Sequence, residues 1–230
     1  MEATKLNKQK LISALVINMI IIVFETIGAA LSIRRHGIKV FQFYTENSNY
    51  VALVVSFVFC VVGIYCLRRN LCLPSWLHHI RYVTTTCLTI TLVVVLCVLT
   101  PLYPNTFIFM MFKDSNLYQH LLCPLLSIIS FTVFENIYKL SFKSTLLAII
   151  PTMFYGVCAI VLNLLKIITG PYPFFYVYVL PWNITTLALI GIVFIAFACA
   201  FLLMFIHNLI GKKSLSKAKS TYEISDKLPI

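Results

Sequence analysis

Long apolar stretches alternate with short polar segments along the whole chain. A helix needs about 20 apolar residues to cross a bilayer. Six stretches meet this requirement, at roughly 11–33, 47–67, 80–100, 117–138, 144–166 and 182–210. The pattern predicts an all-α polytopic membrane protein, with a bundle of six transmembrane helices over residues 1–211. The polar and basic end of the chain, residues 212–230, is predicted to be a disordered cytoplasmic tail.

The composition supports this class and excludes several others. Of the 230 residues, 60% are hydrophobic and 11% are charged, and the mean hydropathy is +0.95. A soluble domain would not stay dispersed with that balance. The net charge of +11 could indicate a nucleic-acid partner. The basic residues fall at the ends of the predicted helices, however, so we expect no nucleic acid.

The distribution of lysine and arginine predicts the orientation in the membrane. Thirteen of these residues precede the first span, follow the last one, or lie in the 68–81 and 139–143 segments. The other five lie on the opposite side, at positions 34, 35, 39, 113 and 166. The positive-inside rule then places both termini in the cytoplasm. No cysteine spacing resembles a metal motif, and we expect neither a metal nor a cofactor.

Polar residues are concentrated where the second span begins, in "FQFYTENSNY" at 41–50. Thr45 opens this span from the outer side, and His120 opens the fourth span from the same side. A lone histidine at this depth is more often an interfacial residue than a catalyst. A hydroxyl at matching depth changes that expectation, because histidine is the usual base that activates a hydroxyl near pH 7. The aromatic and proline-rich stretch "TGPYPFFYVYVLPW" at 169–182 suggests a stiff lid over the same end.

Other polar residues have simpler interpretations. Glu135 is followed one turn later by Lys139, which predicts an ordinary i,i+4 ion pair at the inner interface. His207 is predicted to be interfacial. His78 and His79 are predicted to be solvated in a cytoplasmic loop.

Three short motifs resemble the androgen-induced-gene family of six-span membrane hydrolases, and most closely its small prokaryotic relatives. They are "FYTENSN" at the second span, "HLLCP" in the fourth and "GPYPF" before the sixth. With their order and the six-span layout, they cover nearly the whole chain. The resemblance implies hydrolysis of lipid esters, typically fatty acid esters of hydroxy fatty acids, by a threonine nucleophile and a histidine. These roles carry over to Thr45 and His120. Animal members often carry an acidic residue about three turns after the histidine, where this chain has Ser130.

The resemblance to the prokaryotic branch suggests a multi-pass protein of a prokaryotic plasma membrane. The activity of the wider family implies a membrane lipid or fatty acid ester as its substrate, although the resemblance does not establish the substrates of the prokaryotic branch. In this interpretation Thr45 attacks the ester carbonyl and His120 takes its proton. Candidate donors to the oxyanion are Asn47, Ser48 and Asn49. Asn49 is preferred, since it shares the helix face of Thr45.

Tyr172 is a further candidate donor to the oxyanion. Glu25 in the first span is the most interesting carboxylate, because charges inside a bilayer are costly and often functional. It could orient His120, or pair with a basic residue for structure. Glu46 and Asp114 are the other carboxylates on the outer side. Acyl chains are expected between helices, near Phe57 and Phe131.

Two alternatives remain open. A transporter or non-catalytic lipid-binding protein could use the same polar cavity, although no inverted repeat is visible. A lipid acyltransferase would share the covalent mechanism, with a second lipid in place of water.

Overall fold

The structure is a computed structural model that describes residues 2–103 and 105–225, with side chains from residue 8 to residue 212 apart from residue 104. The described chain is helical and contains no strand. Six helical stretches are long and apolar enough to cross a membrane, as the hydropathy pattern predicts. The chain therefore has the form of an integral multi-pass membrane protein.

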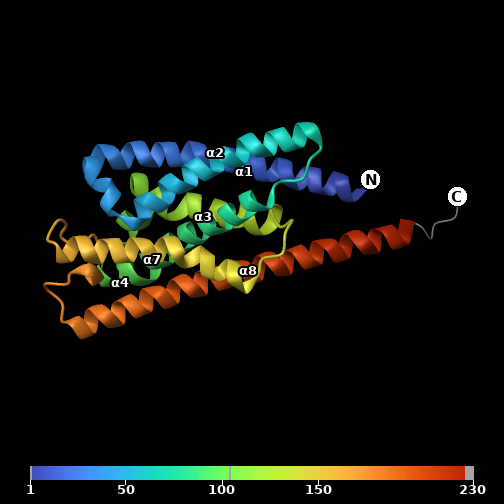
Figure 1. The fold of residues 1–230 in the computed structure, drawn as a ribbon. Helices are drawn as coiled ribbons and strands as arrows, with labels where there is room; N and C mark the ends of the chain where they lie inside the picture. The colour runs from blue at the N-terminus through green and yellow to red at the C-terminus, as the bar shows by residue number, and fades with distance from the viewer. Residues whose placement is uncertain (1, 104, 226–230) are drawn as a thin grey trace.

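Five long helices and a set of shorter ones make up the bundle (Figure 1). The long helices are α1 (Glu2–His36), α2 (Tyr44–Arg69), α3 (Ser75–Val94), α7 (Phe142–Leu164) and α8 (Trp182–Ser225). The shorter elements are η1 (Gly37–Gln42), η2 (Val95–Leu99), α4 (Thr100–Leu102), α5 (Phe107–Phe112), η3 (Leu117–Leu122), α6 (Cys123–Ile129), η4 (Ser130–Phe134) and η5 (Pro173–Phe175).

The fourth span is not a continuous α-helix. It consists of η3, α6 and η4, of which η3 and η4 are π-helical. A π-helical turn widens the helix by one residue and is frequent at functional sites. In this turn Gln119 contacts Glu46 of α2, whereas the next residue, His120, contacts the Met110 carbonyl of α5.

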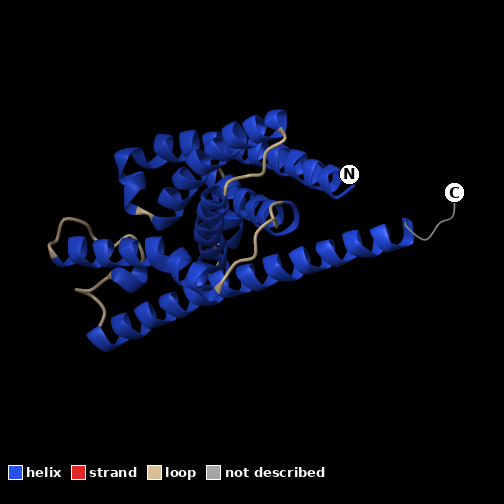
Figure 2. Cartoon of the chain, turned by 45° about the vertical axis from the view of Figure 1, so that its right-hand side comes forward, coloured by secondary structure: helices blue, strands red, loops and turns tan. Residues whose placement is uncertain are grey.

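Helix α3 is the central element. It packs against α2, α6, α7 and α8, and it is the most buried of the six spans. Helices α1 and α2 form an antiparallel pair on one side, and α7 and α8 lie on the other (Figures 1 and 2).

Helix α1 begins and α8 ends at the same end of the bundle, which we call the proximal end (Figure 1). The opposite, distal end carries η1 and the 165–181 segment. Which side of the membrane each end faces stays a prediction. The disorder predicted for residues 212–230 also stays a prediction. Helix α8 continues to Ser225, and residues 226–230 lie outside the described part of the chain.

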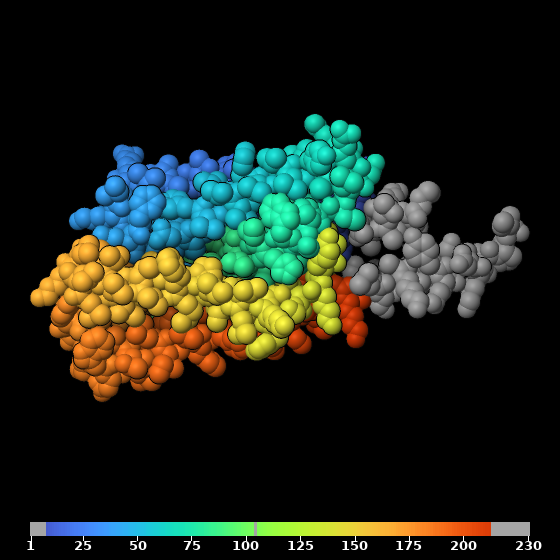
Figure 3. All heavy atoms as spheres, in the orientation of Figure 1, coloured from blue at the N-terminus to red at the C-terminus, as the bar shows by residue number. Residues whose placement is uncertain are grey.

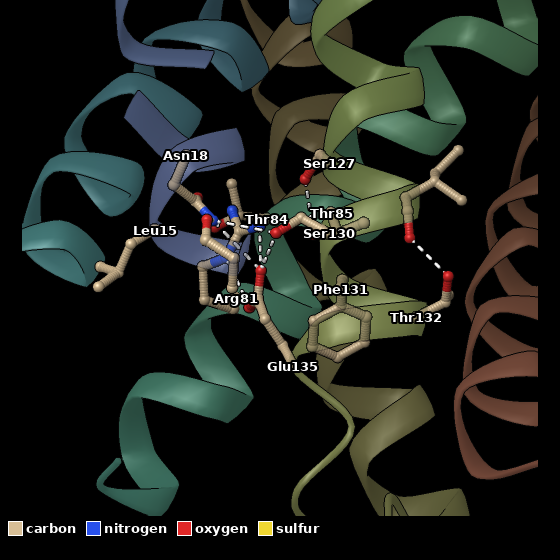
Figure 4. Close-up of polar contacts among 12 residues, drawn as sticks. Leu15, Asn18, Arg81, Thr84, Thr85, Ser127, Ser130, Phe131, Thr132 and Glu135 are labelled. Atoms are coloured by element: carbon tan, nitrogen blue, oxygen red, sulfur yellow. Dashed lines mark hydrogen bonds and ion pairs between the residues drawn. The ribbon is translucent and has the colours of Figure 1, made fainter. Parts of the chain in front are cut away.

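The proximal end contains a buried ion pair that differs from the sequence-based expectation. Glu135 does not pair with Lys139. It accepts two hydrogen bonds from Arg81 of α3, from Nε at 3.0 Å and from Nη2 at 2.9 Å. Ser130 and Asn18 also donate to the same carboxylate, at 2.6 and 3.3 Å (Figure 4). Arg81 is fully buried, so it is a core residue and not part of a cytoplasmic loop.

The pKa of Glu135 reflects this environment. Burial alone would raise it, but the Arg81 guanidinium and the hydrogen bonds from Ser130 and Asn18 hold the pKa below its ordinary value. Glu135 is therefore ionised, and its charge is compensated inside the protein.

Two histidines of the proximal end are also more buried than predicted. His207 is 1% exposed, and its ring nitrogens lie 3.1 Å from the Phe131 carbonyl and 3.0 Å from the Tyr138 carbonyl. His78 lies in α3, not in a loop, and stacks on Phe131. The prediction that both are interfacial or solvated is wrong. Tertiary packing buries them where single-helix hydropathy places them at a boundary.

Candidate active site at the distal end

A cavity of about 250 Å³ opens at the distal end, between α1, α2, η3 and the 171–173 segment. Thr45 and His120 both line it. Other polar residues around it are Arg35, His36, Glu46, Asn116 and Tyr172. The hydroxyl and imidazole that the sequence singles out therefore share one cavity, although they come from different spans. No hydrogen bond joins them in the described part of the chain.

Thr45 occupies the first turn of α2, where backbone N–H groups have no partner within the helix. Its N–H donates to the Tyr172 hydroxyl at 3.2 Å. Its carbonyl accepts from the side chains of Ser48 and Asn49, at 2.9 and 2.6 Å. The start of α2 is thus fixed from the loop side and from within the helix, which holds the Thr45 side chain at the cavity wall.

His120 lies in η3 with one ring nitrogen already engaged. Nδ1 is 2.7 Å from the Met110 carbonyl oxygen. A carbonyl can only accept, so Nδ1 carries a proton and Nε2 of the neutral ring keeps its lone pair. A backbone carbonyl therefore orients this imidazole in the tautomer that a general base requires.

Tyr172 supplies a polar hydrogen next to Thr45. Burial raises the pKa of this phenol to about 12, so its hydroxyl keeps its proton at any physiological pH. Because the oxygen accepts the Thr45 N–H, its own O–H is available to donate. Tyr172 is the predicted oxyanion donor that lines the cavity with Thr45 and His120.

The other predicted donors lie elsewhere. Asn49 is fully buried, and its Nδ2 donates to the Thr45 and Gln119 carbonyls. Asn47 donates to the Phe41 carbonyl, and Ser48 bonds with Thr91 at 2.9 Å. Asn47 and Ser48 line a separate groove between α2, α3 and α7.

Glu25 does not orient His120, since the Met110 carbonyl does so. It lies in α1, 1% exposed, with neither carboxylate oxygen in a hydrogen bond. Sequence reasoning missed Gln119, which donates to Glu46 at 2.8 Å and fixes that carboxylate beside the cavity. It also missed the Met110 carbonyl. Backbone acceptors leave no mark in a sequence, so no residue pattern could have indicated it.

A second, apolar cavity of about 190 Å³ also adjoins Thr45 and lies between α3, α7 and α8. Its walls include Ile90, Ile160 and Phe175, and Gly156 lines it from α7. Thr45 and Tyr172 line both cavities. Phe57 and Phe131, expected near the acyl chain, line neither: Phe57 is 59% exposed, and Phe131 is buried at the proximal end.

A third hollow, of about 480 Å³, is the groove that Asn47 and Ser48 line. Figure 3 shows this face, with α2 and α7 on either side of α3. Its other walls include Val51, Phe154 and Cys158. The groove is thus mainly apolar, with most of its polar groups near the start of α2 and Thr84 on the α3 wall.

Comparison of the chain with protein-family profiles, with curated proteins and with solved structures finds no match. The resemblance carried by the three short motifs therefore remains a hypothesis. Among the described residues, no group of three or more His, Cys, Asp or Glu side chains is placed to hold a metal ion.

Proposed function

We propose that this protein is an intramembrane hydrolase of lipid esters, with Thr45 as the nucleophile and His120 as the general base. One observation carries the proposal: Thr45 lines both a cavity with polar wall residues that contains His120 and an apolar cavity between α3, α7 and α8. An ester of a long acyl chain has the same division into a polar reacting group and an apolar tail.

The proposed reaction uses groups that face the two cavities. The Thr45 hydroxyl attacks the ester carbonyl carbon while Nε2 of His120 takes its proton. The Tyr172 hydroxyl donates to the oxyanion of the tetrahedral intermediate. The intermediate collapses, the acyl–oxygen bond breaks, and His120 returns the proton to the departing alcohol. Water, deprotonated by His120, then attacks the acyl carbon, and His120 returns the proton to Oγ1 of Thr45 as the fatty acid leaves.

The lack of a hydrogen bond between Thr45 and His120 is compatible with this scheme. Catalytic hydrogen bonds are often long without substrate and tighten in the Michaelis complex. A threonine side chain reaches a neighbouring group by rotation about χ1 alone.

The proposal includes the setting inferred from the sequence. The distal end faces the outside of a prokaryotic plasma membrane, and both termini are cytoplasmic. The cavity then lies near the ester groups of the outer leaflet, which gives lipid substrates a lateral route to it.

Hydrolysis of a panel of fatty acid esters by purified protein in detergent tests the proposal. Thr45→Ala should abolish hydrolysis, and Thr45→Ser should keep part of it, because serine preserves the oxygen. A Thr45→Ala/His120→Ala double variant should be scarcely worse than either single one, since the pair acts as a unit. Full activity of Thr45→Ala on every ester that the wild type cleaves would exclude threonine catalysis.

A non-catalytic lipid-binding or transport protein is the second candidate. The groove between α2, α3 and α7, at about 480 Å³, favours it, because this groove is larger than either cavity next to Thr45. In that case the wild type would bind fatty acid esters without turnover, and Thr45→Ala would bind them equally well.

A further inference from the structure

Unpartnered oxygen atoms are concentrated between α1, α2 and η3, behind the wall of the polar cavity. Buried side-chain oxygens are nearly always hydrogen-bonded, because leaving one unpaired destabilises the fold. Five buried oxygens of this region have no hydrogen-bond partner: both of Glu25, Oδ1 of Asn49, the hydroxyl of Tyr50 and Oε1 of Gln119.

Contacts between side chains link these residues into one cluster. Gln119 donates to Glu46, and Asn49 donates to the Gln119 carbonyl at 3.2 Å. Glu25 lies close enough to Glu46 for their charges to interact, and Tyr50 interacts with both carboxylates. We call Glu25, Glu46, Asn49, Tyr50 and Gln119 the oxygen cluster.

Gly28 brings α1 against η3 at this point. A Cβ at position 28 would lie 2.9 Å from Cγ of Gln119, closer than side chains tolerate. A glycine one turn after Glu25 therefore permits the close approach that places Gln119 beside the Glu25 face of α1.

The charge of the oxygen cluster is uncompensated within the described residues. The ion pairs found there are Arg35 with Asp114 and Arg81 with Glu135, so neither Glu25 nor Glu46 has a cationic partner. Glu25 and Glu46 are 1% and 6% exposed. Burying ionised carboxylates without a counter-charge costs several kcal/mol each. The cluster therefore needs either protons or a cation.

From these contacts we infer that the oxygen cluster binds one divalent cation of the calcium class. Two carboxylates balance the double charge. Together with two amide oxygens and a phenol oxygen they offer about six ligands, within the six to eight that Ca²⁺ takes. All are hard oxygen donors. Mg²⁺ fits less well, because it keeps several waters and demands near-octahedral geometry, whereas this cluster is buried.

A bound ion would tie α1, the first turns of α2 and η3 together. Thr45 and His120 directly precede or follow members of the cluster in the sequence. The site would hold these elements at a fixed separation without touching a reacting group. This inference does not depend on the proposed hydrolysis.

Two measurements on the purified protein in detergent test the inference. The first compares thermal unfolding in CaCl₂ with thermal unfolding in EGTA, and the second is equilibrium dialysis against radioactive calcium. We expect a saturable rise in Tm with CaCl₂, a smaller one with MgCl₂, and about one bound ion per chain. Glu25→Gln should lower calcium affinity by more than about a hundredfold, since charge count sets affinity in such sites. Asp114→Asn is the matched control: it removes an exposed carboxylate of the same end and should keep wild-type binding.

Tyr50→Phe provides a second variant in case Glu25→Gln does not fold. It removes only a hydroxyl that has no hydrogen-bond partner, so folding should be preserved while calcium affinity falls about tenfold. If the wild type binds no calcium and its Tm is the same in CaCl₂ and EGTA, the inference is overturned. A Tm that responds to pH but not to calcium would assign the neutralisation to protons instead.

Discussion

The two ends of the bundle bury carboxylates in opposite ways. At the proximal end, Glu135 accepts hydrogen bonds from the Arg81 guanidinium and from two neutral side chains, Ser130 and Asn18. At the distal end, Glu25 has the thiol of Cys123 beside it but no nitrogen or hydroxyl donor of the described residues within hydrogen-bond distance, and its neighbours Asn49 and Gln119 also keep unpartnered oxygens. The physical cost of burial is similar at both ends, but among the described residues only the proximal end places a cationic side chain against its buried carboxylate. At the distal end Glu46 accepts from the neutral side chains of Ser32 and Gln119, and no cation in the described part of the chain pairs with Glu25 or Glu46.

This difference separates a structural cluster from a functional one. The Arg81–Glu135 network saturates its carboxylate, although Nη1 of Arg81 and Oδ1 of Asn18 keep no hydrogen-bond partner. The value of this network lies in joining α3 to the fourth span. The distal residues leave capacity unused: Nε2 of His120, the O–H of Tyr172 and the oxygens around Glu25. We attribute the catalytic and ion-binding roles to that end for this reason.

The largest expected effects come from substituting one histidine at each end of the bundle. His120→Ala should reduce ester hydrolysis by about 10²–10⁴-fold, the usual contribution of a general base, with little change in Tm. His207→Ala should do the reverse, lowering Tm while the folded fraction keeps its rate, because the buried carbonyl that accepts from its ring N–H loses that partner. His36→Ala, in the same cavity as His120, is the control and should leave the rate near wild type. Equal rate losses in all three variants would remove the distinction between the ends.

Breaking the proximal ion pair should cost stability more than any distal change. Arg81→Met should lower the free energy of unfolding by about 3–5 kcal/mol, because it leaves Glu135 buried and uncompensated. The double variant Arg81→Met/Glu135→Leu should recover most of this loss. Arg35→Met, which breaks the exposed pair with Asp114, should cost at most about 1 kcal/mol. Denaturant titration in detergent measures all three, and a harmless Arg81→Met would contradict the structural role.

The sequence predicts much of the fold and part of the candidate site, and the features that it does not predict have physical causes. Hydropathy predicts the six spans, and the polar start of the second span indicates Thr45. The ion partner of Glu135 was mispredicted because i,i+4 spacing suggested Lys139, whereas a tertiary contact 54 residues away prevails. The π-helical turns of the fourth span leave no periodic signal, so the inward positions of Gln119 and the Met110–His120 contact could not be read from spacing.

Tyr172→Phe tests the donor to the oxyanion. Loss of one such donor costs about 10²–10³-fold in turnover. The folded pKa of about 12 also predicts a stability effect. Since an unfolded tyrosine titrates near 10, the unfolded state loses its proton first, and this tyrosine's contribution to stability falls as pH rises from about 10 to 12. Unfolding titrations of wild type and variant should therefore differ in slope only in that range, and an unchanged turnover would remove Tyr172 from the mechanism.

The smallest effect concerns the apolar cavity. A Cβ at Gly156 meets no atom within 4 Å, so Gly156→Leu can fill the cavity wall without a clash. We expect the preference for long over short acyl chains to fall by about tenfold, since a pocket discriminates by about 1–3 kcal/mol per methylene. Gly191→Leu is the matched control: it is also a helical glycine with open space around it, but it lies outside that cavity. An unchanged chain-length profile in Gly156→Leu would place the acyl chain elsewhere.

The central claim is that the hydroxyl of Thr45 is a nucleophile. Its most direct test is to treat the purified protein with a fluorophosphonate probe and to locate the adduct by mass spectrometry. The account predicts one labelled peptide, modified at Thr45, with labelling lost in Thr45→Ala, strongly reduced in His120→Ala and retained in Thr45→Ser. An adduct on another residue, or equal labelling of Thr45→Ala, would contradict it.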